Sequence, residues 1–153
     1  MAGTILRGDN LTGVIWSIIA GAAMSFQGVL NTGLSERAGL FESNAFVQGT
    51  AFILSLIVMF IFGKGNFREI FTADKIFLTG GALGIIITVT VMLSIKKLSP
   101  TVAISIILIS QLLVAAIIDA FGLLGAEKIG FHPTKYIGVA LMIAGVIVFK
   151  LKS

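Results

Sequence analysis

Five long apolar runs, separated by short segments that hold nearly every charge, constrain this chain more than any other feature of its sequence. The runs cover residues 11–34, 43–62, 76–95, 101–124 and 133–151. Of the 18 charged residues (11 Lys and Arg, 7 Asp and Glu), only Asp119 lies within the core of a run. Because a helix rises 1.5 Å per residue, about 20 apolar residues cross the hydrocarbon core of a bilayer. The pattern predicts an all-α, polytopic membrane protein in which residues 1–153 form a single domain of five transmembrane helices.

The composition excludes several other classes of protein. Hydrophobic residues make up 57% of the chain and charged residues 12%, half of the roughly 25% in a soluble domain. Such a chain cannot cover itself with polar surface, which excludes a soluble enzyme, a disordered chain and a disulfide scaffold. The net charge of +4 comes from Lys and Arg beside apolar runs, as in membrane-flanking segments. We therefore expect the lipid bilayer, and not nucleic acid, as a partner.

Transmembrane helices are favoured over transmembrane strands. A strand in a membrane alternates apolar and polar residues, whereas runs such as residues 104–109 do not alternate. A helix also satisfies its own backbone hydrogen bonds in lipid. The prolines agree with this interpretation, because Ser99 and Pro100 match the N-cap and first position of a helix, and Pro133 matches the same first position in the fifth run.

The fifth run is the shortest of the five. Its apolar core, residues 136–149, contains 14 residues. The segment reaches 19 residues, from 133 to 151, if Lys135 and Lys150 extend their ammonium groups to the membrane interface. We expect it to span the bilayer, with less length to spare than the other four.

The Lys and Arg residues are divided almost equally between the two sides of the membrane. Side one, which would hold the N-terminus and the second and fourth loops, has six: Arg7, Lys64, Arg68, Lys75, Lys128 and Lys135. Side two, which would hold the first and third loops and the C-terminus, has five: Arg37, Lys96, Lys97, Lys150 and Lys152. A clear excess normally marks the cytoplasmic side. The balance predicts insertion in both orientations; the alternative is one orientation, set by weak bias or by a partner.

Three segments carry a resemblance to a known family. They are residues 21–31 (GAAMSFQGVLN), Gln48-Gly49, and residues 111–125 (QLLVAAIIDAFGLLG), of which the last is the most distinctive. Over essentially its whole length the chain resembles the short YdcZ-like branch of five-helix proteins in the drug/metabolite transporter superfamily. Larger members of that superfamily look like two such units fused in opposite orientation. The resemblance implies half of a ten-helix antiparallel assembly, here a homodimer, in a bacterial-type inner membrane.

Asp119 is the leading candidate for a functional group within the membrane. It lies about 10 Å from the middle of its run toward side one, where burying a charge is less unfavourable than at the bilayer centre. One interpretation is a carboxylate that binds and releases a proton or a cation during transport. The other is a structural acid paired with Lys128 or with a basic residue of a second copy. Gln111, Ala115 and Asp119 are four residues apart and share a helix face, which we expect to point into the protein.

The remaining candidates for substrate contact are neutral amides and one aromatic residue. Gln27 and Asn31 are neighbours on the first helix, and Gln48 lies on the second. Such amides also join helices by hydrogen bonds, so contact with a substrate and contact with another helix stay open. Gln111 is the preferred ligand contact. Trp16 fits an interfacial position or stacking on a cation.

Small residues at four-residue spacing predict close helix packing. Such spacing lets two helix backbones approach each other. The residues are Ser17, Gly21 and Ser25 in the first run, Gly80 and Gly84 in the third, and Ala140 and Ala144 in the fifth.

These features favour a secondary active transporter of small organic solutes that works by alternating access and is coupled to protons. A passive channel and a non-transporting assembly subunit remain as alternatives. We expect no enzyme activity, no cofactor and no metal site, because the chain has no cysteine and His132 has no second ligand or nucleophile at useful spacing. The substrate itself is not predictable from these residues.

Overall fold

The computed structural model describes residues 8–129 and 133–150, and within these ranges every regular element is a helix. Five α-helices correspond to the five apolar runs: α2 (Gly8–Ala38), α3 (Leu40–Phe62), α4 (Gly80–Lys97), α5 (Pro100–Phe121) and α6 (Pro133–Lys150). Three short 3₁₀ helices lie in the connections: η1 (Phe67–Thr72), η2 (Lys75–Thr79) and η3 (Leu123–Gly125). The all-α prediction is confirmed.

Four of these helical segments are long and apolar enough to cross a membrane. They cover Leu11–Ala38, Leu40–Phe62, Lys75–Lys97 and Pro100–Phe121. The fifth is a shorter apolar helix, Tyr136–Val148, within α6. Four to five apolar helices in a chain of this length form a polytopic membrane protein. That the whole chain acts as one domain remains a prediction.

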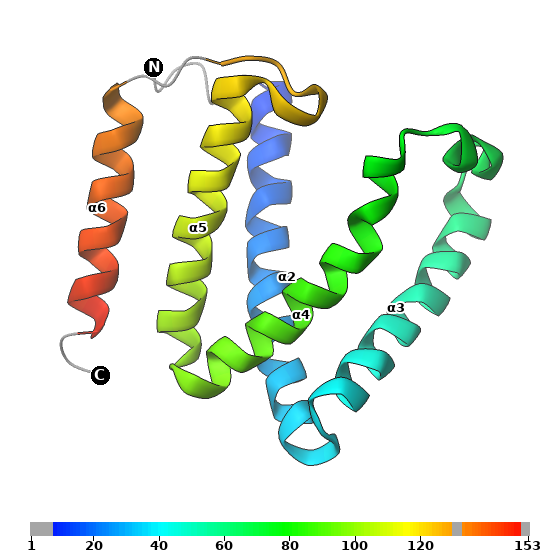
Figure 1. The fold of residues 1–153 in the computed structure, drawn as a ribbon, viewed down its shortest axis with the longest axis horizontal. Helices are drawn as coiled ribbons and strands as arrows, with labels where there is room; N and C mark the ends of the chain where they lie inside the picture. The colour runs from blue at the N-terminus through cyan, green and yellow to red at the C-terminus, as the bar shows by residue number, and fades with distance from the viewer. Residues whose placement is uncertain (1–7, 130–132, 151–153) are drawn as a thin grey trace. The chain divides into compact units, whose positions relative to one another are not determined.

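The chain divides into two compact units, Met1–Lys96 and Lys97–Ser153. In the first, α2 and α3 contact each other and are joined by Gly39 alone (Figure 1). Gly39 has φ 101° and ψ 156°, a conformation that is essentially restricted to glycine. Its amide donates to the carbonyl oxygen of Ser35, and its own carbonyl accepts from Ser43. A single glycine therefore reverses the chain between two membrane-spanning helices.

Helix α4 packs closely on α2 at a second glycine, Gly28. A Cβ atom at Gly28 would lie 2.9 Å from Cδ1 of Ile95 and 3.2 Å from Cγ1 of Val91. Both distances are shorter than ordinary van der Waals contact, so this approach depends on the absence of a side chain at Gly28. Ile95 and its neighbour one turn back, Met92, are among the few buried hydrophobic residues.

In the second unit, α5 and α6 pack side by side, and α5 begins and ends as its sequence indicates (Figure 1). The Ser99 hydroxyl accepts from the amide of Val102 and Pro100 follows at the first helical position, which confirms the predicted cap. The helix ends at Phe121, because Gly122 takes the left-handed conformation with φ 63°. The last three residues of the apolar run therefore lie beyond α5.

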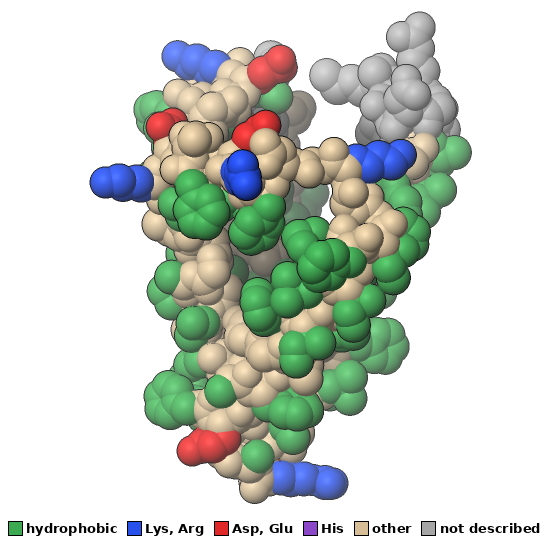
Figure 2. Space-filling view, turned by 90° about the vertical axis from the view of Figure 1, so that its right-hand side faces the viewer, with side chains coloured by type: hydrophobic (Ala, Val, Ile, Leu, Met, Phe, Trp, Pro, Cys, Tyr) green, Lys and Arg blue, Asp and Glu red, His purple; other side chains and the backbone are tan. Residues whose placement is uncertain are grey.

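The distribution of side chains is the reverse of that in a soluble protein. Large hydrophobic residues are exposed along every α-helix, whereas the residues buried most completely include five polar ones: Asn31, Thr32, Ser35, Ser43 and Asn44. Figure 2 shows hydrophobic side chains over the middle of one face and most charged ones toward its ends. Such a surface is suited to lipid or to another apolar chain.

Candidate functional site

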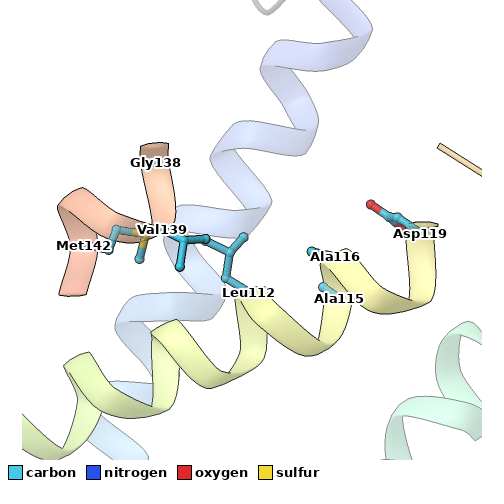
Figure 3. A pocket seen from close by; sticks show the side chains of 7 residues that line it. All are labelled: Leu112, Ala115, Ala116, Asp119, Gly138, Val139 and Met142. Carbon is cyan, nitrogen blue, oxygen red and sulfur yellow. The ribbon is translucent and has the colours of Figure 1, made fainter. Parts of the chain in front are cut away.

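A pocket of about 250 Å³ lies between α5 and α6 (Figure 3). Helix α5 contributes Leu112, Ala115, Ala116 and Asp119, and α6 contributes Gly138, Val139 and Met142. Asp119 is the only charged residue among these seven, and the other six are apolar. The site is therefore a hydrophobic recess with one carboxylate.

The pocket arises from the spacing of small residues. On α5, Ala115, Ala116 and Asp119 fall on one side of the helix because they are three and four residues apart. Opposite them, Gly138 and Met142 lie one turn apart on α6. Because alanine and glycine fill little volume, space remains beside the carboxylate.

The Asp119 carboxylate is half-buried and has no hydrogen-bonding or ionic partner among the described residues. Its main-chain oxygen accepts a hydrogen bond of 2.8 Å from the amide of Ile129, which returns the following loop to the end of α5. That loop places the backbone of Lys128 close to Gly122, but Lys128 and Asp119 form no ion pair in the described structure. Within the described part of the chain, no basic or hydrogen-bonding group therefore neutralises this carboxylate.

The face predicted from Gln111, Ala115 and Asp119 is divided in the structure. Ala115 and Asp119 line the pocket, whereas Gln111 is exposed and does not line it. An exposed amide within an apolar span is unfavourable in lipid. Within the described residues, Gln111 therefore has no polar contact that would offset this cost.

Gln48 joins α3 to α4. Its Nε2 atom donates to the Thr88 hydroxyl at 3.4 Å, and that hydroxyl donates to the Gly84 carbonyl oxygen at 2.9 Å. A Cβ atom at Gly84 would lie 3.5 Å from the same Nε2 atom. Gln48 therefore lies in a contact between helices, and a Cβ atom at Gly84 would meet it at an ordinary van der Waals distance.

The other candidates on α2 lie in different environments. Gln27 is exposed, and Trp16 is exposed as well, whereas Asn31 is only 8% exposed. Across the turn, Ser43 and Asn44 are also buried, and the Ser43 hydroxyl and the Asn44 Oδ1 atom have no partner among the described residues. Gln27 and Asn31 therefore do not share one environment despite their four-residue spacing.

Most of the small residues proposed for packing face open space. The hydroxyls of Ser17 and Ser25 donate to carbonyl oxygens of their own helix, those of Gly13 and Gly21, at 2.9 and 3.0 Å. No described atom of another element lies within 4 Å of a Cβ placed at Gly21 or Gly80. Ala140 and Ala144 on α6 are likewise exposed. Their role in packing remains a prediction.

Sequence reasoning identified the Asp119 side of the pocket and missed the α6 side. No charged or reactive group marks Gly138, Val139 and Met142 in the sequence. Only the four-residue spacing of Gly138 and Met142 indicates that these two share a helix face. Ser43 and Asn44 were missed too, although polar residues at the start of an apolar helix were a visible signal.

Several residues considered above lie outside the described part of the structure. These are Arg7, His132 and Lys152, together with the side chains of Lys135 and Lys150. Within the described residues, no group of three or more His, Cys, Asp and Glu is placed to hold a metal ion.

The apolar helices, the exposed hydrophobic surface and the recess with one acid define a polytopic α-helical membrane protein with a candidate solute site. Residues 12–148 match the model of the family described as "Putative inner membrane exporter, YdcZ", and the chain belongs to this family. It is thus an integral inner-membrane protein of a transporter family and not an enzyme. Comparisons with curated proteins and with solved structures found no match.

Proposed function

We propose that the protein is a secondary active transporter of small organic solutes, coupled to protons, that works as an antiparallel homodimer. The observation that carries this proposal is the Asp119 carboxylate, which lies in an otherwise apolar pocket and has no ionic or hydrogen-bonding partner among the residues that the structure describes. A charged carboxylate is unfavourable in such surroundings and gains from a proton or a cationic ligand. Exchange between these two states couples proton movement to solute movement.

The antiparallel homodimer rests on the charge balance and on the open surfaces of one copy. Six Lys and Arg on one side against five on the other favour neither orientation. Two copies related by a two-fold axis in the membrane plane reproduce the inverted-repeat symmetry of many secondary transporters. In such a pair, Gln111 and the small residues around Gly21 contact the second copy. In a single protomer, the described residues provide these positions with no packing partner.

Alternating access follows from that symmetry. In an antiparallel pair, the two copies enclose one shared cavity at their interface. When the two copies exchange conformations, that cavity opens first to one side of the membrane and then to the other, and the bound solute crosses with it. Gln111, Gln27, Asn31, Gln48 and Trp16 are the proposed contacts for the polar and aromatic parts of a solute. One acid per chain favours neutral, zwitterionic or monocationic solutes over multivalent anions.

Purified protein in liposomes tests this function directly. We expect solute flux that saturates with concentration and is accompanied by a pH change, reported by a dye trapped in the vesicles. The assay uses a panel of small neutral, zwitterionic and monocationic organic solutes, with protein-free liposomes as the control. Flux that rises linearly without saturation would indicate a passive channel. Flux that requires a second polypeptide would indicate an assembly subunit.

A further inference from the structure

The connection between α3 and α4, residues 63–79, exposes aromatic side chains at the end of a membrane span. Phe67 is 58% exposed and Phe71 78% exposed, and their rings pack edge to face with centroids 6.4 Å apart. Ile70 is exposed on the same short helix, η1. Because a phenyl ring carries no polar group, contact of these rings with lipid is more favourable than contact with water. The segment is therefore placed to contact phospholipids.

A groove of about 580 Å³ lies between the end of α3 and η1. Its apolar wall comprises Met59 and Phe60 of α3 with Phe67 and Ile70 of η1. Gly63 turns the chain out of α3 and donates a 2.8 Å hydrogen bond to the Met59 carbonyl oxygen. A Cβ at Gly63 would collide with that oxygen, so the corner depends on glycine. The groove is a product of this corner and opens at the level where α3 leaves the apolar region.

Polar and basic groups lie at the same corner. Asn66 lines the groove; its Oδ1 accepts from the amide of Arg68 at 3.1 Å, and its Nδ2 has no partner among the described residues. Lys64 lies between two lining glycines, and Arg68 follows Phe67 directly. Glu69 is the one acid of η1; like Lys64 and Arg68, it lies beside the groove without lining it. Two basic side chains, Lys64 and Arg68, therefore lie next to the apolar groove with only one acidic side chain of η1, Glu69.

We propose that this groove binds one anionic phospholipid, with an acyl chain against the apolar wall and the phosphate held by Lys64, Arg68 and the Asn66 amide nitrogen. The apolar wall selects a lipid over a soluble phosphate, because a headgroup alone leaves that wall exposed to water. The two cations select an anionic headgroup over a zwitterionic one. This site is separate from the Asp119 pocket and does not depend on the transport function.

The test measures binding of phosphatidylglycerol and phosphatidylcholine with identical acyl chains to the purified full-length protein in neutral detergent. Each basic residue near an anionic lipid strengthens binding by roughly fivefold, so we expect the double variant Lys64→Gln/Arg68→Gln to lose roughly 25-fold in affinity for phosphatidylglycerol. Binding of phosphatidylcholine should change little. Lys96→Gln/Lys97→Gln, which removes two cations from another loop, is the matched control and should leave both affinities unchanged.

Two further arms separate the parts of the proposal. Phe67→Ser should weaken both lipids alike, because it removes part of the acyl-chain wall and no charge. Glycerol phosphate, the soluble headgroup without chains, should not compete with phosphatidylglycerol. Equal affinity of the native protein for the two lipids would overturn the proposal. So would effective competition by glycerol phosphate, or an equal loss in the Lys96/Lys97 control.

Discussion

Two forms of the protein, each locked in one of the two membrane orientations, are expected to be inactive alone and active together. Glu69→Lys with Glu127→Lys changes the count of Lys and Arg from six against five to eight against five in favour of side one. Glu36→Lys, Glu42→Lys and Leu98→Lys change it to eight against six in favour of side two. Because the native bias is almost zero, additions of this size should fix the orientation.

The expected difference in transport is close to complete. Each locked form can assemble only parallel pairs and should show background uptake, whereas co-expression of both forms restores the antiparallel pair. The same positions changed to Gln remove the same native side chains without adding a cation, and these control variants should stay active when expressed alone. Full uptake from either Lys form by itself would contradict the antiparallel requirement.

Asp119→Asn is expected to abolish pH-driven accumulation of solute while leaving a folded protein. The variant cannot exchange a proton at this position, so uptake against a gradient should fall to background, but solute should still equilibrate across the membrane. Stability should hold or rise, because a charge that is unfavourable in the membrane is removed. Liposomes with and without a pH gradient, together with thermal unfolding in detergent, measure the two effects.

The same variant separates the two interpretations of Asp119. If the carboxylate were half of a buried ion pair with a second copy, the Asn variant would leave a cation unpaired and dimer stability would fall by about 3–5 kcal/mol. Asp119→Glu keeps the carboxylate and should retain coupling. Asp74→Asn, which removes an acid from the exposed connection before η2, is the control and should change neither property. A stable Asp119→Asn protein with normal pH-driven uptake would contradict the coupling role.

The helices could be predicted from hydropathy, but their ends could not. The extent of an apolar run indicates which residues contact lipid. The ends of a helix are set instead by the residues at which its backbone hydrogen bonding is interrupted. Helix α2 therefore extends four residues past the first run to Ala38, and Gly39 then turns the chain. Residues 76–79 belong to the third run but adopt 3₁₀ geometry in η2, and α4 begins at Gly80. At α5 the signals were visible, because Ser99, Pro100 and Gly122 each have a specific backbone role.

The candidate site could be predicted only where its chemistry is unusual. Asp119 stands out because it is the one acid within an apolar run, and its four-residue spacing from Ala115 places both on one face. Gly138, Val139 and Met142 complete the pocket through packing of α6 on α5, which depends on tertiary structure and leaves no distinctive residue types in the sequence. Gln48 illustrates the opposite case, since its polar group was evident but its contact with Thr88 was not.

The orientation of the native protein in the membrane is the most direct test of the central claim. A tag at the C-terminus can be labelled with a membrane-impermeant reagent, first in intact cells or spheroplasts and then after permeabilisation. An antiparallel homodimer requires that about half of the copies present the tag on each side. If more than about nine in ten copies share one orientation, as a clear charge bias would produce, the antiparallel homodimer is wrong.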